Sequence, residues 1–270
     1  MDDTFMSRLR ENFEWIRRDS DASGTLKAGL LSSLAGELSL RDPVPTPEDA
    51  LAMLDALGIS DAESTAALSL LLFREKKDGQ HETVPSHISY MRSQASDRAF
   101  RIFSEHYENM SVSYGTDFKS ICEDVYDKRA DACILPLEST DSGLLMSFRS
   151  LVLKYELSIF AACRVRQNDD SLLTLALLTP ERHVIGDIAE FYLPSVPLGS
   201  LETLSKVAEV FGTSLLRAST VASEYPGEYN IHACALIPTH MTSAFDFCLE
   251  TLYPSYTPLG NYSLLNNGKE

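Results

Sequence analysis

The sequence predicts a protein that joins an α/β part to an α+β part, with a helical segment in front. Apolar residues recur every three or four positions through residue 73, which indicates short helices. Residues 88–137 read as β-α-β-α-β. Residues 188–264 read as βαββαβ, which is typical of a four-stranded antiparallel sheet with two helices on one face. We therefore expect domains at residues 1–80, 86–180 and 186–265.

Composition and charge exclude several classes of function. The chain has 270 residues, of which 44% are hydrophobic, and this suffices for two or three compact units. Lys and Arg number 23 against 39 Asp and Glu, and the resulting charge of −16 repels nucleic acid and anionic membranes. The first residues are acidic where a signal peptide would be basic, and no apolar run approaches bilayer-spanning length. We expect a cytoplasmic protein that binds neither nucleic acid nor membrane.

Cysteine and histidine spacing gives no metal signature. The six histidines lack ligand spacing, and the sequence contains no phosphate-binding glycine loop. The cysteines are odd in number and mostly lie in apolar runs, so we expect buried free thiols. They are Cys122, Cys133, Cys163, Cys234 and Cys248. No metal and no cofactor are expected.

The N-terminal segment carries clear helix signals. Apolar spacing indicates helices within residues 5–16 and 26–34. Thr46 and Pro47, followed by two acidic residues, predict the start of a third helix. Either Ser60 or Asp61 caps a fourth. Together these helices would form a small bundle.

The middle of the chain predicts a sheet with one polar turn at a functional position. Strands are expected at residues 88–91, 111–114, 132–137, 157–165 and 172–178, and helices at 97–107, 117–126 and 144–153. The polar turn spans residues 138–143, between a buried strand and a helix. An open α/β sheet places ligands there, because unpaired helix N–H groups can bind a carboxylate or phosphate.

This turn resembles the signature of a known family. Residues 136–143 read Pro-Leu-Glu-Ser-Thr-Asp-Ser-Gly and are similar to the Pro-Ile-Glu-Asn-Ser-x-x-Gly signature of prephenate dehydratases, with Ser139 in place of the Asn. The resemblance implies a periplasmic-binding-like α/β lobe and a role in aromatic amino-acid (phenylalanine) biosynthesis. The family's reaction is the dehydration and decarboxylation of prephenate to phenylpyruvate, with a hydroxyl group assisting departure of the ring hydroxyl. The implied substrate contacts are Glu138, Ser139, Thr140 and Gly143.

Three departures from the family pattern bear on catalysis. The family's glycine-rich turn is replaced by residues 92–96, which contain no glycine, so side chains should crowd this space. Between the strands at 157–165 and 172–178, where the family inserts a second lobe, this chain has a short polar turn. The family's catalytic Thr-Arg-Phe motif aligns with Ser171 and two leucines, so Leu172 cannot supply the cation.

The resemblance leaves three hydroxyl residues as catalytic candidates. Ser171 aligns with the family's catalytic Thr, and Thr174 is a rival for that position. Thr140, in the polar turn, is the other candidate. A purely structural interpretation of Ser171 stays open as well, because hydroxyl residues favour turns that follow Asn and Asp.

The C-terminal part resembles an ACT domain, the ferredoxin-like regulatory module that follows the dehydratase in this family. Gly199-Ser200-Leu201 is similar to its Gly-Ala-Leu, and residues 259–262, Leu-Gly-Asn-Tyr, are similar to its closing Leu-Gly-Ser-Tyr. The resemblance implies a phenylalanine effector at a dimer interface. The implied contacts are Gly199, Ser200, Leu201, Ser219 and Thr220.

Sensing by this domain is in doubt, because the family's Glu-Ser-Arg-Pro is here Ser-Thr-Val-Ala at residues 219–222. Burying a free amino acid without charged partners costs several kcal/mol. A sensing domain and a structural, dimerising one therefore stay open.

The first 80 residues have the place of a chorismate mutase in fused dehydratases and are faintly similar to one. A dicarboxylate site needs several cations, however, and Arg41 is the one basic residue between Ala28 and Phe73. An inert helical or dimerising segment is the other interpretation.

We expect a catalytically degenerate homologue that regulates or assembles, as a homodimer through residues 186–265. It could bind a small aromatic or prephenate-like ligand. The alternatives are an active prephenate dehydratase, with or without mutase activity, and an interaction module unrelated to aromatic metabolites.

Overall fold

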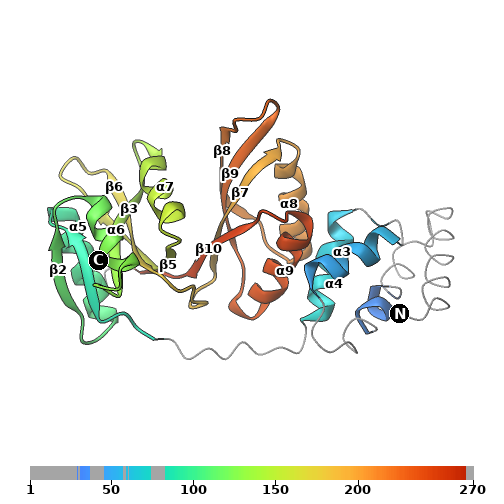
Figure 1. Cartoon of the computed structure of the whole chain (residues 1–270), viewed down its shortest axis with the longest axis horizontal. Helices are drawn as coiled ribbons and strands as arrows, with labels where there is room; N and C mark the ends of the chain where they lie inside the picture. The colour runs from blue at the N-terminus through green and yellow to red at the C-terminus, as the bar shows by residue number, and fades with distance from the viewer. Residues whose placement is uncertain are drawn as a thin grey trace. The chain divides into compact units, whose positions relative to one another are not determined.

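The computed structural model describes residues 29, 31–36, 46–56, 59, 61–73 and 83–265. The chain forms two compact units, one from residues 1–78 with 192–257 and the other from residues 79–191 with 258–270. The unit of residues 79–191 with 258–270 is called the α/β unit, and the unit of residues 1–78 with 192–257 is called the second unit. Figure 1 draws the elements of both. The helix expected within residues 5–16 lies outside the described residues. The division into three domains stays a prediction.

The α/β unit is built on a seven-stranded mixed sheet. Its elements are β1 (His87–Met91), α5 (Gln94–His106), β2 (Ser111–Gly115), α6 (Phe118–Tyr126), β3 (Ala132–Ser139), β4 (Gly143–Leu144), α7 (Met146–Lys154), β5 (Ser158–Arg166), β6 (Leu172–Thr179) and β11 (Leu264–Leu265). The strand order is β11-β5-β6-β3-β1-β2, with β4 paired to β3. β1 is parallel to β2 and β3, whereas β6 is antiparallel to β3 and β5.

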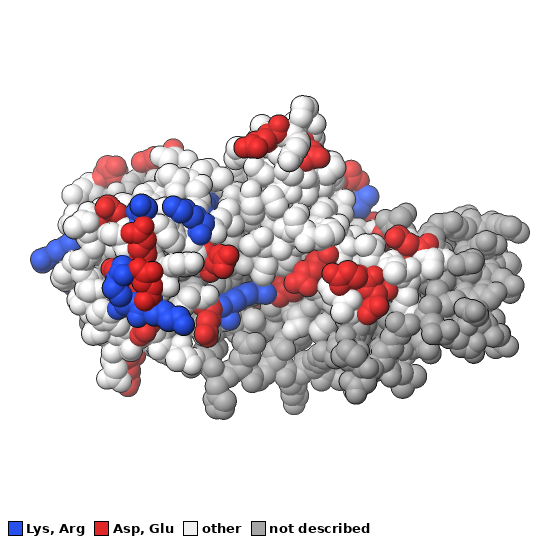
Figure 2. Space-filling view, viewed as in Figure 1, with Lys and Arg blue, Asp and Glu red and all other residues white. Residues whose placement is uncertain are grey.

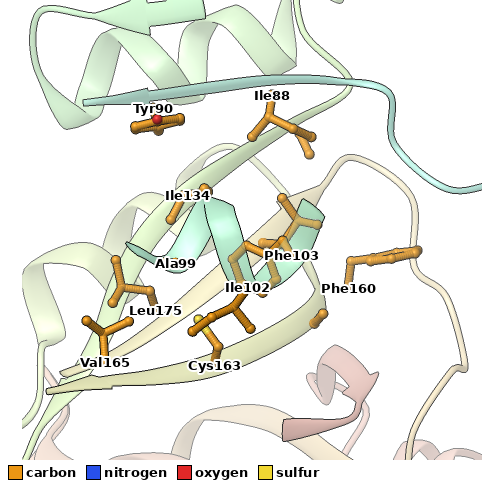
Figure 3. Close-up of a cluster of buried hydrophobic side chains, with 13 residues drawn as sticks. Ile88, Tyr90, Ala99, Ile102, Phe103, Ile134, Phe160, Cys163, Val165 and Leu175 are labelled. Atoms are coloured by element: carbon orange, nitrogen blue, oxygen red, sulfur yellow. The ribbon is translucent and has the colours of Figure 1, made fainter. Parts of the chain in front are cut away.

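Helix α5 covers one face of this sheet and seals its main core. Its apolar residues Ala99, Ile102 and Phe103 are buried together with side chains from four strands, as Figure 3 shows. Those strand residues include Ile88, Ile134, Phe160, Val165 and Leu175. The sheet is apolar on this face because alternate residues of each strand point to it.

The opposite face of the sheet is covered by α6. Asp117 caps this helix by accepting from Ser120 N at 2.8 Å, and Ser120 Oγ reaches back to the Asp117 backbone N at 3.3 Å, which completes a capping box. Cys122 of α6 hydrogen-bonds Cys133 of β3. This contact and burial raise the pKa of the Cys133 thiol well above its usual value, so Cys133 is protonated and unreactive. All five cysteines are free and buried.

The second unit combines the N-terminal helices with most of a βαββαβ arrangement. Its elements are α3 (Pro47–Ala56), α4 (Ala62–Leu72), α8 (Ser200–Val210), β8 (Leu215–Ala222), β9 (Glu228–Leu236), a 3₁₀ turn η1 (Thr239–Met241) and α9 (Thr242–Leu252). The arrangement is completed by β7 (Ile188–Pro197) and β10 (Thr257–Tyr262). The four-stranded sheet has the order β10-β7-β9-β8. The boundary between the two units falls inside β7 and β10.

The N-terminal helices pack on the helices of the βαββαβ part. Of the two residues proposed to cap α4, Asp61 does so, accepting from Ser64 N at 2.9 Å. α4 lies against α8 and α9, and the Phe73 and Phe247 rings are 5.3 Å apart. Residues 31–36 are helical, and Leu31 and Leu34 share a core with Met53 and Leu54 of α3. The helical segment and the C-terminal helices therefore form one packed layer.

The Leu-Gly-Asn-Tyr motif at residues 259–262 contacts other residues of the α/β unit, to which it belongs. The Leu259 carbonyl accepts from Ser158 Oγ at 3.1 Å, and the Asn261 carbonyl accepts from Ile185 N at 3.0 Å. Tyr262 Oη donates to Glu190 at 2.7 Å. Gly260 has φ +146°, and a Cβ there would lie 2.4 Å from the Ile159 carbonyl oxygen. The motif is thus a set of packing contacts in which only glycine fits the second position.

We predict that Gly260→Ala lowers the free energy of unfolding by about 2 kcal/mol or more, because it adds both backbone strain and a clash with backbone atoms. Gly36→Ala is the matched control, since Gly36 is helical with no atom within 4 Å of an added Cβ. Urea unfolding of both variants measures the difference. Equal stability of the two would contradict the packing role of the motif.

Candidate functional site

The topology of the α/β unit points to one edge of its sheet. β1 lies between β2 and β3, and the connecting helices α5 and α6 lie on opposite faces. The strand order therefore reverses between β1 and β3. In open α/β sheets, ligands bind beyond the carboxyl ends of the strands at such a reversal.

A pocket of about 430 Å³ lies at this edge. Its walls are the start of α5 and the turn between β5 and β6. Arg98 joins the two walls, because its Nη1 donates to the Arg166 carbonyl at 2.7 Å. The lining residues are Ser93, Gln94, Ala95, Arg98, Arg166, Gln167, Asn168, Asp169 and Leu173.

The start of α5 forms one wall of this pocket. The helix was expected from residue 97 and begins at Gln94, with Ser93 Oγ accepting from Ser96 N at 3.1 Å as the N-cap. Tyr90 of β1 anchors the first turn by donating its hydroxyl to Asp97 at 3.0 Å, and burial raises the Tyr90 pKa. Residues 92–96 were expected to crowd the space after β1. Gln94, Ala95 and Ser96 form the first turn of α5, and Ser93, Gln94 and Ala95 line the pocket.

The polar turn at residues 138–143 differs from the expected strand-to-helix turn. β3 continues to Ser139 and folds back into β4, with Ser139 paired to Gly143. The loop has three residues, 140–142, and Gly143 follows it with φ +66°, which glycine adopts without strain. α7 begins only at Met146, and no side chain caps it. The expectation that this turn sits directly at a helix N-terminus was wrong, because the glycine allows a hairpin first.

Thr140 and Ser171, two of the three catalytic candidates, lie close to each other at the ends of the neighbouring strands β3 and β6. Thr140 Oγ1 accepts from Leu172 N at 3.0 Å, and Thr140 N donates to the Leu172 carbonyl at 2.9 Å. Thr140 is exposed, as is Gly143, whereas Ser139 is buried and Glu138 half-buried. The rival Thr174 is half-buried on β6, paired with Glu138 and Arg164. The candidates from the β3–β4 hairpin and from the start of β6 therefore lie at the same edge of the sheet.

Ser171 is held by the residues of its own turn. Its hydroxyl donates to Asp169 Oδ1 at 2.7 Å, and its backbone N donates to the same oxygen at 3.2 Å. Gln167 Nε2 donates to the Ser171 hydroxyl at 3.1 Å. The two bonds from Ser171 hold the pKa of Asp169 below its usual value, the hydroxyl contributing most. The serine proton is therefore directed at an ionised carboxylate, and the side chain is 7% exposed.

A buried ion pair, absent from the sequence expectations, supports the helix that follows the hairpin. Arg149 of α7 pairs through Nη1 with Glu190 of β7, whose other oxygen accepts from Tyr262 Oη at 2.7 Å. Both charged side chains are 2% exposed. Arg149 Nε and Nη2 are buried without hydrogen-bond partners. The sequence did not indicate that Arg149 is buried, because an arginine on a helix usually extends its charged group into water.

The predicted effector residues come from two places in the βαββαβ part. Gly199 and Ser200 begin α8, where Gly199 is exposed and Ser200 is buried against Tyr253. Leu201 follows in the first turn of α8 and is half-buried. Ser219 and Thr220 lie on β8, paired with His232 and Ile231 of β9. No described hydrogen bond joins the α8 group to the β8 group.

Charge is distributed unevenly over the chain. In the described residues of the second unit, the only Lys and Arg side chains are Lys206 and Arg217, against eleven Asp and Glu residues. Lys and Arg residues are more frequent in the α/β unit, and Figure 2 shows several of them on the face drawn. Among the residues that the structure covers, no group of three His, Cys, Asp or Glu could hold a metal ion. None of the described helices is long and apolar enough to cross a membrane.

Comparison with known proteins gives a likeness in fold. No family model matches the chain, and no curated protein matches it in sequence. A prephenate dehydratase from Streptococcus mutans superposes with a TM-score of 0.54 at 16% identity, over 67% of this chain and 99% of that one. A prephenate dehydratase from Arthrobacter aurescens, solved in complex with L-Phe, superposes with a TM-score of 0.52 at 12% identity, over 66% and 90%. GqqA, described as a novel type of quorum quenching acylase, also gives 0.52 at 12% identity, over 66% and 94%. The chain therefore has a prephenate dehydratase-like fold.

We predict that Arg149→Met destabilises the protein by about 3–5 kcal/mol, because it leaves Glu190 buried without its cation. The double variant Arg149→Met/Glu190→Leu should recover most of this loss, since it removes both buried charges. Arg129→Met, which breaks an exposed ion pair with Asp124 and Asp127, serves as the control and should change little. Chemical unfolding measures all three. A double variant no better than Arg149→Met would contradict the ion-pair account.

Proposed function

We propose that this protein is a prephenate dehydratase-like protein that has lost dehydratase catalysis and acts as a ligand-binding, regulatory or assembly component. The proposal depends on one observation. β5 and β6 are neighbouring antiparallel strands, with Arg166 paired to Leu172. Gln167 N donates to the Ser171 carbonyl at 2.8 Å, and Asp170 takes φ +64° to close the turn.

This direct connection supports loss of catalysis, because it leaves a substrate less enclosed by protein. The family resemblance implies a second lobe between these two strands and a substrate enclosed between the lobes. A four-residue turn, from Gln167 to Asp170, cannot contain such a lobe. A ligand at the carboxyl edge would then be bound from one side, without the water exclusion that strengthens electrostatic interactions in an active site.

The chemistry at Ser171 supports the same proposal. A general acid must lie within hydrogen-bond reach of the group it protonates and transfer its proton there. The Ser171 hydroxyl already donates to the ionised Asp169 and is buried. Leu172, at the place where the family resemblance implies a cation, offers only its backbone, which is bonded to Thr140.

Likeness of fold does not by itself fix a reaction. The same fold is shared by prephenate dehydratases and by an acylase, and a fold can carry unrelated chemistry. The described residues between 46 and 73 contain no Lys or Arg, which weighs against a mutase site for a dicarboxylate. An active dehydratase remains the alternative that an assay can distinguish.

We assign assembly to the βαββαβ part as an ACT-like module. The order β10-β7-β9-β8 leaves β8 at one edge of its sheet, where Leu216 is 52% and Val221 43% exposed. An open edge strand with apolar side chains is a template for pairing with another chain. Pairing with a second copy across a twofold axis would satisfy this edge. Because the second unit is so acidic, the contact should be mainly apolar and persist in salt.

The first functional prediction concerns turnover. The purified full chain should convert prephenate to phenylpyruvate no faster than the uncatalysed rate, measured by phenylpyruvate absorbance in alkali. Robust turnover that falls about a hundredfold or more on Ser171→Ala would show an active general acid and overturn the proposal. Robust turnover that survives Ser171→Ala but not Thr140→Val would overturn it as well and assign catalysis to Thr140.

The second functional prediction concerns assembly. The full chain should be a dimer by light scattering at low and high salt, and Leu216→Arg/Val221→Lys should be monomeric, because both changes place charge on the β8 edge. Tyr126→Lys is the control, since Tyr126 is 63% exposed but lies on α6. A monomeric wild type, or a charged β8 variant that stays dimeric, would remove β8 from this role.

A further inference from the structure

We propose that the pocket between the start of α5 and the β5–β6 turn binds a small zwitterionic ligand, an α-amino acid with an apolar side chain. The inference deepens the proposed ligand-binding function by naming the class of ligand and its site. It is carried by a pocket of about 430 Å³ that has Arg98 on the α5 wall and Asp169 on the turn wall. Arg166 also lines the turn wall, and its guanidinium lies 3.9 Å from the carboxylate of Asp170.

The α5 wall suits the carboxylate of the ligand. Arg98 lines the pocket and uses Nη1 for the Arg166 carbonyl, which fixes the guanidinium at the pocket and leaves its other N–H groups for a ligand. Gln94 and Ala95 also line the pocket, and their backbone N–H groups belong to the first helical turn, which has no acceptors within the helix. These amides would assist the guanidinium through the positive end of the helix.

The turn wall suits the ammonium group. Asp169 lines the pocket, and both bonds from Ser171 go to its Oδ1, so Oδ2 is left for a ligand. The carboxyl is exposed and ionised at neutral pH, and the same bonds lower its pKa further. The side chains of Gln167 and Asn168 add amide groups beside it. A fixed negative charge here attracts an ammonium group and repels a second carboxylate.

The remaining lining and the size of the pocket define the rest of the ligand. Ala95 and Leu173 are half-buried and give the pocket an apolar surface between its charged walls. Ligand pockets range from roughly 300 to 1,000 Å³, so this one suits a compact molecule. A dianion such as prephenate would place one carboxylate near Asp169, whereas an amino acid places an ammonium group there.

The experiment is calorimetric titration of the full chain with L-leucine, L-methionine and L-phenylalanine, followed by analogues of leucine. We expect at least one amino acid to bind with a Kd in the millimolar range or tighter. 4-Methylpentanoate lacks the ammonium group, 3-methylbutylamine lacks the carboxylate, and isobutylmalonate replaces the ammonium with a second carboxylate. Each should bind at least about tenfold more weakly than leucine, because each lacks a charge-assisted contact.

Two variants and one control locate the binding. Arg98→Met should weaken amino-acid binding about tenfold or more, whereas Arg101→Met, on the same helix but outside the pocket lining, should leave it unchanged. Asp169→Asn keeps an acceptor for Ser171 and should abolish the preference for leucine over 4-methylpentanoate. This preference is a ratio within one protein, so partial unfolding of a variant does not affect it.

Several results would overturn the inference. They are no binding of the three amino acids, tighter binding of isobutylmalonate than of leucine, or binding that Arg98→Met and Asp169→Asn leave unchanged. The binding experiment and the turnover assay test different claims, so either can fail without the other. Prephenate turnover would overturn the proposed function whether or not an amino acid binds. If none of the three amino acids binds and there is no turnover, only the ligand assignment is overturned.

Discussion

The direct antiparallel pairing of β5 with β6 is the constraint on which the site depends. The pairing runs from Ser158 opposite Thr179 to Arg166 opposite Leu172, and the turn between the strands is short. It places Ser171 and Leu172 beside Thr140 of the β3–β4 hairpin, and it makes the turn at residues 167–170 a wall of the pocket. The Ser171 hydroxyl closes this turn by donating to Asp169.

A second set of contacts holds the end of the chain on the α/β unit. Tyr262 bonds the Glu190 carboxylate that pairs with Arg149, and Gly260 allows its strand to approach Ile159. A buried ion pair need not raise the free energy of unfolding, but removal of one partner lowers it strongly, because the other charge stays buried. We therefore regard the closing motif and the ion pair as one packed cluster. α7, which follows the β3–β4 hairpin, is fixed by this cluster.

Much of the secondary structure could be predicted, because apolar periodicity encodes it directly. The strands at residues 157–165 and 172–178 and the short turn between them were expected from their apolar runs, and they are neighbours in the sheet. The β3–β4 hairpin was missed, because it depends on the positive φ of Gly143, and a glycine that precedes an apolar run fits a helix start equally well. The pocket was missed because Arg98 and Arg166 are distant in sequence and meet only through the strand order. The order of the strands in the sheet cannot be read from a short stretch of sequence. Thr140 and Ser171 were found through family resemblance, and their roles stay predictions.

The central claim is that β5 passes straight into β6, so that one lobe alone faces any ligand. Nuclear Overhauser effects in a deuterated, amide-protonated sample test it in solution. The account predicts interstrand contacts linking Arg164 with Thr174 and Arg166 with Leu172, together with a contact from the Thr140 amide to the amide of Leu172. Absence of these contacts while those between β1 and β2 are present would show that the two strands are separated, and it would contradict the account.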